Sequence, residues 1–154
     1  MTTQVQSNNS YISTHETTGK DQLLRNALRG NGVFSTVSGI AFIVGSSQIA
    51  DFLGIADADI LGLMKGSTFL LITGVSLLLF AGGLFFNSSR STIIKGLAWE
   101  AVAMDVIWVL GSAIVLLTDA LPFTTAGSWA VLIVADIVAT FALFQYLGIR
   151  RMNK

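Results

Sequence analysis

The sequence predicts an all-α membrane protein: a bundle of four transmembrane helices, preceded by a short amphipathic helix at the membrane surface. Hydrophobic residues make up 53% of the 154 residues and charged residues only 12%, whereas soluble domains carry roughly a quarter charged residues. The charges fall almost entirely outside four long apolar blocks. A soluble domain could not bury so much apolar surface, so we expect these blocks to lie in a bilayer.

The chain before the first block divides into two parts. Residues 1–20 are rich in Ser, Thr, Asn and Gln and lack apolar periodicity, which predicts a disordered polar tail. In residues 21–31, apolar side chains recur at helical spacing: Leu23, Leu24, Ala27 and Leu28. With arginines beside it, this stripe is typical of a helix in the membrane interface. We expect Gly30-Asn31-Gly32 to break the chain before the first span.

Each of the four apolar blocks is long enough to cross a membrane, which takes about 20 apolar residues. The blocks run from Gly32 to Phe52, from Gly66 to Phe86, from Ile93 to Leu117 and from Gly127 to Leu147. Short connections favour antiparallel packing of neighbouring helices, although the first connection has room for an extra turn of helix. We therefore expect a transmembrane domain over residues 32–149 and a basic tail over residues 150–154.

Basic residues gather at one set of span ends. Eight of the nine lie there: Lys20, Arg25, Arg29, Arg90, Lys95, Arg150, Arg151 and Lys154. Lys65 lies at the opposite ends, with Asp51, Asp57, Asp59 and Asp119. Because positively charged loops stay in the cytoplasm, the sequence predicts that both termini are cytoplasmic.

Two acids within the apolar blocks are the main candidates for chemistry. Asp105 lies ten residues after Lys95, and Asp136 lies nine after Gly127. At a rise of about 1.5 Å per residue, both should lie roughly 15 Å into their helices, near the middle of the membrane. An acid at that depth costs at least about 2.5 kcal/mol, so it is by default a candidate functional site.

Other polar side chains are expected near these acids and complete a candidate intramembrane cluster. Trp108 and Ser112 share the helical face of Asp105, and Thr140 follows Asp136 by one turn. Ser38, Thr73 and Ser76 fall at a similar depth. Two interpretations stay open: a proton or cation relay through the two acids, or a polar clasp that holds the third and fourth helices together. The clasp is favoured, because such hydrogen bonds commonly join helices.

The residue types exclude several classes of enzyme. The chain has no cysteine, and its single histidine, His15, lies in the polar N-terminal segment. A histidine-ligated haem, a zinc site and a histidine-activated nucleophile are therefore not expected. Equal numbers of basic and acidic residues also argue against nucleic acid as a partner. We expect no enzyme activity, no cofactor and no metal.

The two halves of the transmembrane region resemble one another faintly. Aligning Arg29-Gly30 with Lys95-Gly96 brings Gly45-Ser46 onto Gly111-Ser112, and aligning Gly66-Ser67 with Gly127-Ser128 brings Arg90 onto Arg151. Both halves would enter from the same side, as in a parallel repeat. Shared membrane composition explains the matches equally well, so duplication stays open.

Several short motifs resemble those of small four-span bacterial membrane proteins that are loosely likened to DoxX-type families. They are Leu28-Arg29, Asn31, Phe34-Ser35 and Ser38-Gly39 in the first span, Asp105, Trp108-Val109 and Gly111-Ser112 in the third, and Gln145-Tyr146, Gly148 and Arg150-Arg151 at the end. The resemblance implies a multi-pass protein of the bacterial cytoplasmic membrane and assigns no residue a role. We expect a structural or accessory subunit of a membrane complex, in contact with lipid and with other chains or copies of itself. The alternative is a small proton-coupled carrier that uses its intramembrane aspartates.

Overall fold

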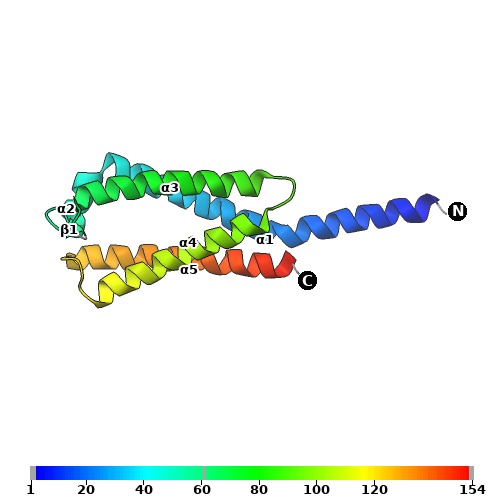
Figure 1. Cartoon of the computed structure of the whole chain (residues 1–154). Helices are drawn as coiled ribbons and strands as arrows, with labels where there is room; N and C mark the ends of the chain where they lie inside the picture. Colours follow the sequence, from blue (N-terminus) through cyan, green and yellow to red (C-terminus); the bar gives the residue numbers. More distant parts are fainter. Residues whose placement is uncertain (1–2, 61, 153–154) are drawn as a thin grey trace.

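The structure, a computed structural model, describes residues 3–60 and 62–152, without the side chains of residues 3–18 and Lys20. Its helices are α1 (Thr3–Val44), α2 (Ser46–Leu53), α3 (Gly66–Ser89), α4 (Lys95–Leu117) and α5 (Thr125–Met152). Two short antiparallel strands, β1 (Asp59–Ile60) and β2 (Met64–Lys65), lie between α2 and α3. Figure 1 shows the four long helices running side by side, up and down the length of the molecule.

Four helical segments are long and apolar enough to cross a membrane, which confirms the predicted fold class. They are Asp21–Val44 within α1, Gly66–Ser89, Lys95–Leu117 and Thr125–Met152. The last three agree with the predicted spans. Because α5 continues to Met152, Arg150 and Arg151 form part of its last turn rather than a separate tail.

The first span differs from the prediction. We expected it over residues 32–52, after a break at Gly30-Asn31-Gly32, but α1 is one continuous helix through these residues. A Cβ added to Gly30 would lie 3.0 Å from Cε1 of Phe141, and one added to Gly32 would lie 3.0 Å from Cζ of Phe85. These glycines therefore serve close packing against neighbouring helices instead of ending the helix.

The expected surface helix over residues 21–31 is part of the first span. Its apolar stripe is buried in the bundle: Leu24 and Leu28 are fully buried, and both belong to a core that also contains Ala98 and Ile149. An amphipathic stripe can pack against a neighbouring helix as well as against a membrane surface. The apolar pattern of residues 21–31 therefore does not distinguish the two environments. The predicted tail, residues 1–20, coincides with the start of α1, and its side chains up to residue 18 lie outside the described residues, so the disordered tail stays a prediction.

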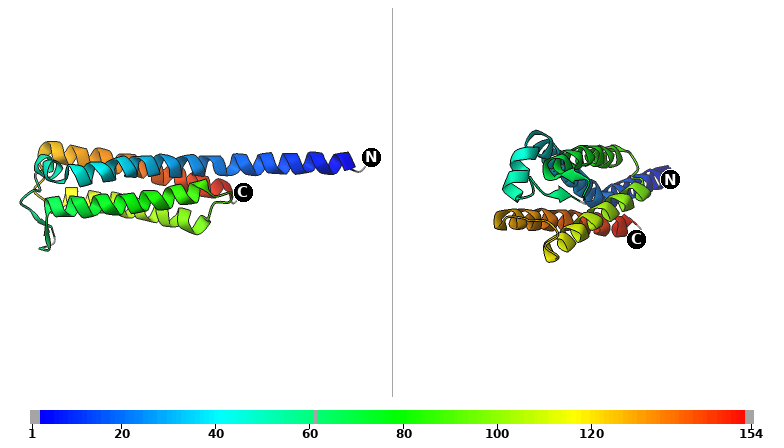
Figure 2. Two further views of the ribbon diagram at one scale, coloured as in Figure 1. Left: turned by 90° about the horizontal axis from the view of Figure 1, so that it is seen from above. Right: turned by 60° about the vertical axis from the view of Figure 1, so that its left-hand side comes forward.

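The long helices form an open arc in the order α3, α1, α5, α4. Helix α1 packs along both α3 and α5, and α4 packs along α5, whereas α3 touches α4 only sparingly. In Figure 1, α4 leaves the loop after α3 and then runs obliquely toward α5. The right-hand view in Figure 2 shows two layers, with α1 and α3 in one and α4 and α5 in the other, and the left-hand view shows α1 running beside α5. The fold therefore brings α3 and α4 near each other mainly where the loop joins them.

One end of the bundle, which we call the acidic end, is closed by α2 and the loop after α4. Gly54 ends α2 in the left-handed conformation, at φ 84°, and a Cβ there would lie 2.7 Å from the Pro122 carbonyl oxygen. Thr124 joins the two segments, because its hydroxyl donates to the Phe52 carbonyl and accepts from the Gly127 amide. The same threonine thereby caps the start of α5.

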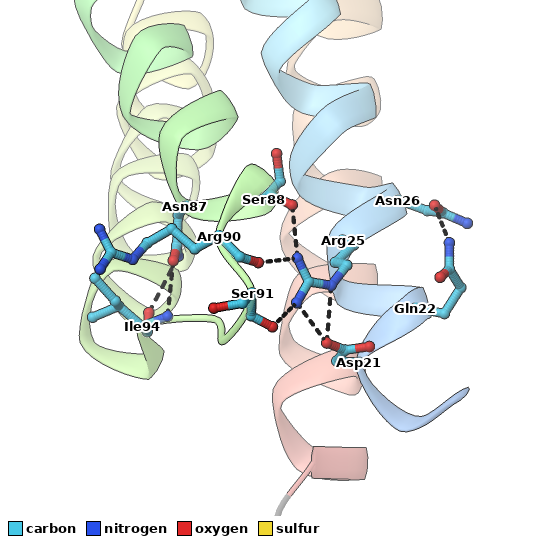
Figure 3. Close-up of polar contacts among 9 residues, drawn as sticks. All are labelled: Asp21, Gln22, Arg25, Asn26, Asn87, Ser88, Arg90, Ser91 and Ile94. Carbon is cyan, nitrogen blue, oxygen red and sulfur yellow. Dashed lines mark hydrogen bonds and ion pairs between the residues drawn. The ribbon is translucent and has the colours of Figure 1, made fainter. Parts of the chain in front are cut away.

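The opposite end, which we call the basic end, is fastened by Arg25 of α1. Its guanidinium donates to the backbone carbonyls of Ser88, Arg90 and Ser91, at 2.6 to 2.9 Å, and pairs with Asp21 at 2.8 Å (Figure 3). The carbonyls at the end of a helix lack partners within it, and Arg25 supplies donors for them. Asn87 braces the same loop through two hydrogen bonds with the backbone of Ile94.

Candidate functional site

Asp105 is the centre of a buried polar network that joins three helices. Its side chain is 4% exposed. Oδ2 accepts a hydrogen bond of 2.7 Å from Asn31 Nδ2 on α1 and one of 3.0 Å from Gln145 Nε2 on α5. Both amide side chains are almost fully buried. The carboxyl group thus has amide donors from two other helices.

The network continues on α1 and contains one polar atom without a partner. The hydroxyl of Ser35, one turn after Asn31, donates to Asn31 Oδ1 at 3.3 Å. Both the nitrogen and the oxygen of the Asn31 side chain are therefore hydrogen-bonded. Among the described residues, Gln145 Oε1 is the buried side-chain oxygen or nitrogen without a hydrogen bond. We refer to Asn31, Ser35, Asp105 and Gln145 as the Asp105 network.

Helix geometry explains why these residues meet. Small residues let the backbones approach: a Cβ added to Gly148 would lie 2.8 Å from the Cα of Leu24. At this crossing of α1 and α5, Gln145 lies about one turn before Gly148, and Asn31 lies two turns after Leu24. Hydrogen bonds contribute about 0.5–1.5 kcal/mol each, which helps to offset the cost of burying an acid.

The two intramembrane acids do not share one environment. Asp105 is buried, whereas the side chain of Asp136 is exposed on the outer face of α5. Thr140, expected beside it, donates to the Asp136 backbone carbonyl at 3.0 Å and is exposed as well. The structure therefore places Asp136 beside Thr140, and it places Asp105 beside the amide side chains of Asn31 and Gln145.

The remaining members of the predicted cluster line two cavities between the helix layers. One, of about 310 Å³, is bordered by Asp105, Ser76 and Trp108. The other, of about 370 Å³, is bordered by Trp108 and Ser112. Trp108 thus borders both spaces, and Ser76 of α3 borders the same space as Asp105 while its hydroxyl donates to the Ile72 carbonyl.

Sequence reasoning missed Asn31 and Gln145 as partners of Asp105. Asn31 was interpreted as part of a helix break, and Gln145 was noted only within a short motif. Both lie in apolar surroundings, where an amide side chain needs a hydrogen-bond partner. A search for every amide within the spans, rather than for acids and hydroxyls, would have found them.

The site has no features of a metal centre within the described part of the chain, where no group of three or more His, Cys, Asp or Glu side chains lies close together. Asp105 is surrounded instead by amide donors, aromatic rings and hydroxyl groups. This arrangement can accept hydrogen bonds in an apolar space. It does not supply a nucleophile with an adjacent base.

The four apolar helices identify the chain as a membrane protein. No protein-family model, no curated protein and no solved structure matches the chain. The resemblance to DoxX-type proteins therefore stays a prediction.

Proposed function

We propose that the protein is a structural or accessory subunit of a membrane complex, and that it binds its partner through the outer face of α5. The observation that carries this proposal is the exposed side chain of Asp136. It lies within a continuous exposed stripe of α5 that is otherwise apolar or weakly polar: Trp129, Leu132, Ile133, Asp136, Thr140 and Leu143.

An acid on this face is costly if only lipid covers it. Asp136 is eleven residues from the start of α5, or roughly 16 Å along the helix. A neighbouring helix that offers an amide, hydroxyl or basic side chain would remove that cost. By contrast, Asp105 already has its donors within the chain, so it contributes to the fold and not to the contact.

We place the protein in the bacterial cytoplasmic membrane, with both termini in the cytoplasm. This orientation is supported by the basic end, where Arg25, Arg90 and Arg150 lie, and by the acidic residues at the other end. The partner is another membrane chain or a second copy that buries the α5 stripe.

Cysteine crosslinking in the native membrane tests the proposal, because the chain has no cysteine of its own. Ile133→Cys and Thr140→Cys on α5 should form crosslinks with a partner chain. Leu110→Cys and Ile114→Cys, on an equally exposed face of α4, are the matched controls and should not. In the Ile133→Cys background, Asp136→Leu should abolish the crosslink, whereas Asp136→Asn should retain it. Equal crosslinking from α4 and α5, or none from α5, would contradict the proposal.

One observation favours the second candidate, a proton-coupled carrier: Asp105 borders a cavity. The support is weaker, because Asp136 faces away from this space. Reconstituted protein should show no proton or solute flux under an imposed pH gradient if the subunit proposal is right. A flux that Asp105→Asn abolishes would favour the carrier instead.

A further inference from the structure

The two cavities beside Asp105 form one crevice between α3 and α4. Four residues border both spaces: Phe42, Thr73, Met104 and Trp108. Residues of α1, α3, α4 and α5 border the crevice, and α3 and α4 have few contacts with each other. Each space is within the usual range for a small-molecule site, about 300–1,000 Å³.

The crevice is polar at one end and apolar at the other. Asp105, Asn31 and Ser38 border the first space. The second is bordered mainly by aromatic and aliphatic side chains, and Leu53, Ile55, Leu121 and Phe123 close it at the acidic end. A ligand that fits both parts has one polar group and a longer apolar portion.

The polar groups in the walls have unused hydrogen-bonding capacity. In helices, hydroxyl groups commonly donate to the carbonyl four residues earlier, and Thr36, Ser76 and Thr140 do so here. The hydroxyls of Ser38, Thr73 and Ser112, which also border the crevice, make no hydrogen bond with any of the described residues. Asp105 accepts both of its bonds at Oδ2, which leaves Oδ1 for a ligand.

The charges around the crevice select the type of polar group. Its walls contain one acid, Asp105, and no basic residue. A phosphate or carboxylate head group would find no partner there and would be repelled by a carboxylate. A hydroxyl group, in contrast, donates a hydrogen bond to Oδ1 and carries no charge to desolvate. Val37, Met104 and Ile107 border the crevice and are each more than half exposed, so a molecule dissolved in the bilayer can enter from the side.

We propose that this crevice binds a neutral lipid whose hydroxyl group donates to Oδ1 of Asp105 and whose apolar chain extends past Trp108 toward Phe69 and Phe123. The crevice and the exposed α5 stripe are separate surfaces, because they are bordered by different residues of α5. The lipid proposal and the partner proposal can therefore fail independently.

Quenching of Trp108 fluorescence tests this proposal directly. In a Trp99→Phe, Trp129→Phe background, Trp108 is the single tryptophan. The probes are a brominated long-chain primary alcohol and its methyl ether, added to protein in nanodiscs. The ether has the same apolar chain but no donor. We expect the alcohol to bind about ten-fold or more tightly than the ether, since the ether has no hydrogen to donate to Oδ1. Equal quenching by both probes would overturn the proposal.

Two substitutions locate the site and use the geometry of the crevice. Gly111 borders the apolar space and has nothing within 4 Å of an added Cβ, so Gly111→Leu should fill the space and abolish quenching without disturbing the fold. Gly82→Leu, at an equally open position on α3 that borders neither space, should leave quenching unchanged. Asp105→Asn should remove the preference for the alcohol, because the amide nitrogen donates to either probe. Quenching that survives Gly111→Leu, or a preference that survives Asp105→Asn, would refute the assignment.

Discussion

The two helical hairpins of this protein are held together by different means. In the first, α1 and α3 meet backbone to backbone: a Cβ added to Gly39 would lie 2.8 Å from the Gly74 carbonyl oxygen, and the reverse distance is also 2.8 Å. In the second, α4 carries Asp105 at the comparable depth. A Cβ added to Gly111 of α4 would have nothing within 4 Å. Close glycine packing therefore joins the first hairpin, whereas a hydrogen bond between Asp105 of α4 and Gln145 of α5 joins the second.

The same contrast bears on the faint internal repeat. The alignment that places Arg29 on Lys95 also places Gly39 on Asp105, and the alignment of Gly66 with Gly127 places Gly74 on Ala135. The pair of glycines that seals the first hairpin is thus replaced in the second by an acid and an alanine. The Asp105 network of the second hairpin therefore stands where the first hairpin has its close glycine contact.

The largest effect is expected from breaking the glycine contact. Gly74→Ala places a Cβ 2.8 Å from the Gly39 carbonyl oxygen and 2.9 Å from Cγ1 of Ile43, so it should destabilise the fold by about 2–3 kcal/mol. Gly82→Ala on the same helix has open space and should be neutral or slightly stabilising. Unfolding in mixed detergent micelles measures both. Similar unfolding curves for the two variants would show that the first hairpin does not depend on its glycines.

The next largest effect should come from the second hairpin. Asp105→Leu leaves the donors of Asn31 and Gln145 without an acceptor and should cost about 1–3 kcal/mol. Asp105→Asn keeps one acceptor oxygen and should cost less than about 1 kcal/mol. Asp136→Leu is the matched control, because that acid is exposed and its loss should not weaken the isolated chain. The same unfolding assay distinguishes them, and an equal loss for Asp105→Leu and Asp136→Leu would contradict the role of the network.

A smaller effect is expected at the basic end, where both hairpins meet. Arg25→Lys keeps the charge but loses the planar donors that reach three carbonyls. It should destabilise the α3–α4 loop by about 1 kcal/mol. The measurement is the rate of tryptic cleavage after Arg90, followed by mass spectrometry, with Arg29→Lys on the exposed side of α1 as the control. Unchanged cleavage in Arg25→Lys would mean that the loop is ordered by Asn87 alone.

The smallest effect should come from the ion pair between Lys65 and Asp59, at 3.4 Å. Both side chains are more than half exposed, and exposed pairs contribute little because solvent screens them. Lys65→Gln should change stability by less than about 0.5 kcal/mol. A loss comparable to that of Arg25→Lys would show that the acidic end is fastened more tightly than its described contacts imply.

The spans could be predicted where length and apolar composition define them. This held for α3, α4 and α5. The first span differs, because apolar residues continue past Gly45 into α2, while the candidate span of the structure begins at Asp21, in an amphipathic stretch. Composition alone cannot separate a stripe that faces lipid head groups from one that faces another helix.

The site could be predicted only in part, for a related reason. Asp105 was recognisable because an acid within a span is rare. Its partners were not, since Asn31 lies 74 residues away in sequence and Gln145 lies 40 away. Local spacing predicts which residues share a helix face, but which faces meet depends on how the helices are ordered around α1.

The position of Gln145 on α5 also has a consequence for biosynthesis. Helices α1 and α3 can pair through their glycines as soon as both are inserted, because that contact needs nothing made later. The bond between Asn31 and Asp105 needs only α1 and α4, whereas the bond from Gln145 to Asp105 forms once α5 is in place. Until α5 is inserted, Asp105 lacks one of its two amide donors inside the membrane. The insertion of α5 therefore completes the Asp105 network.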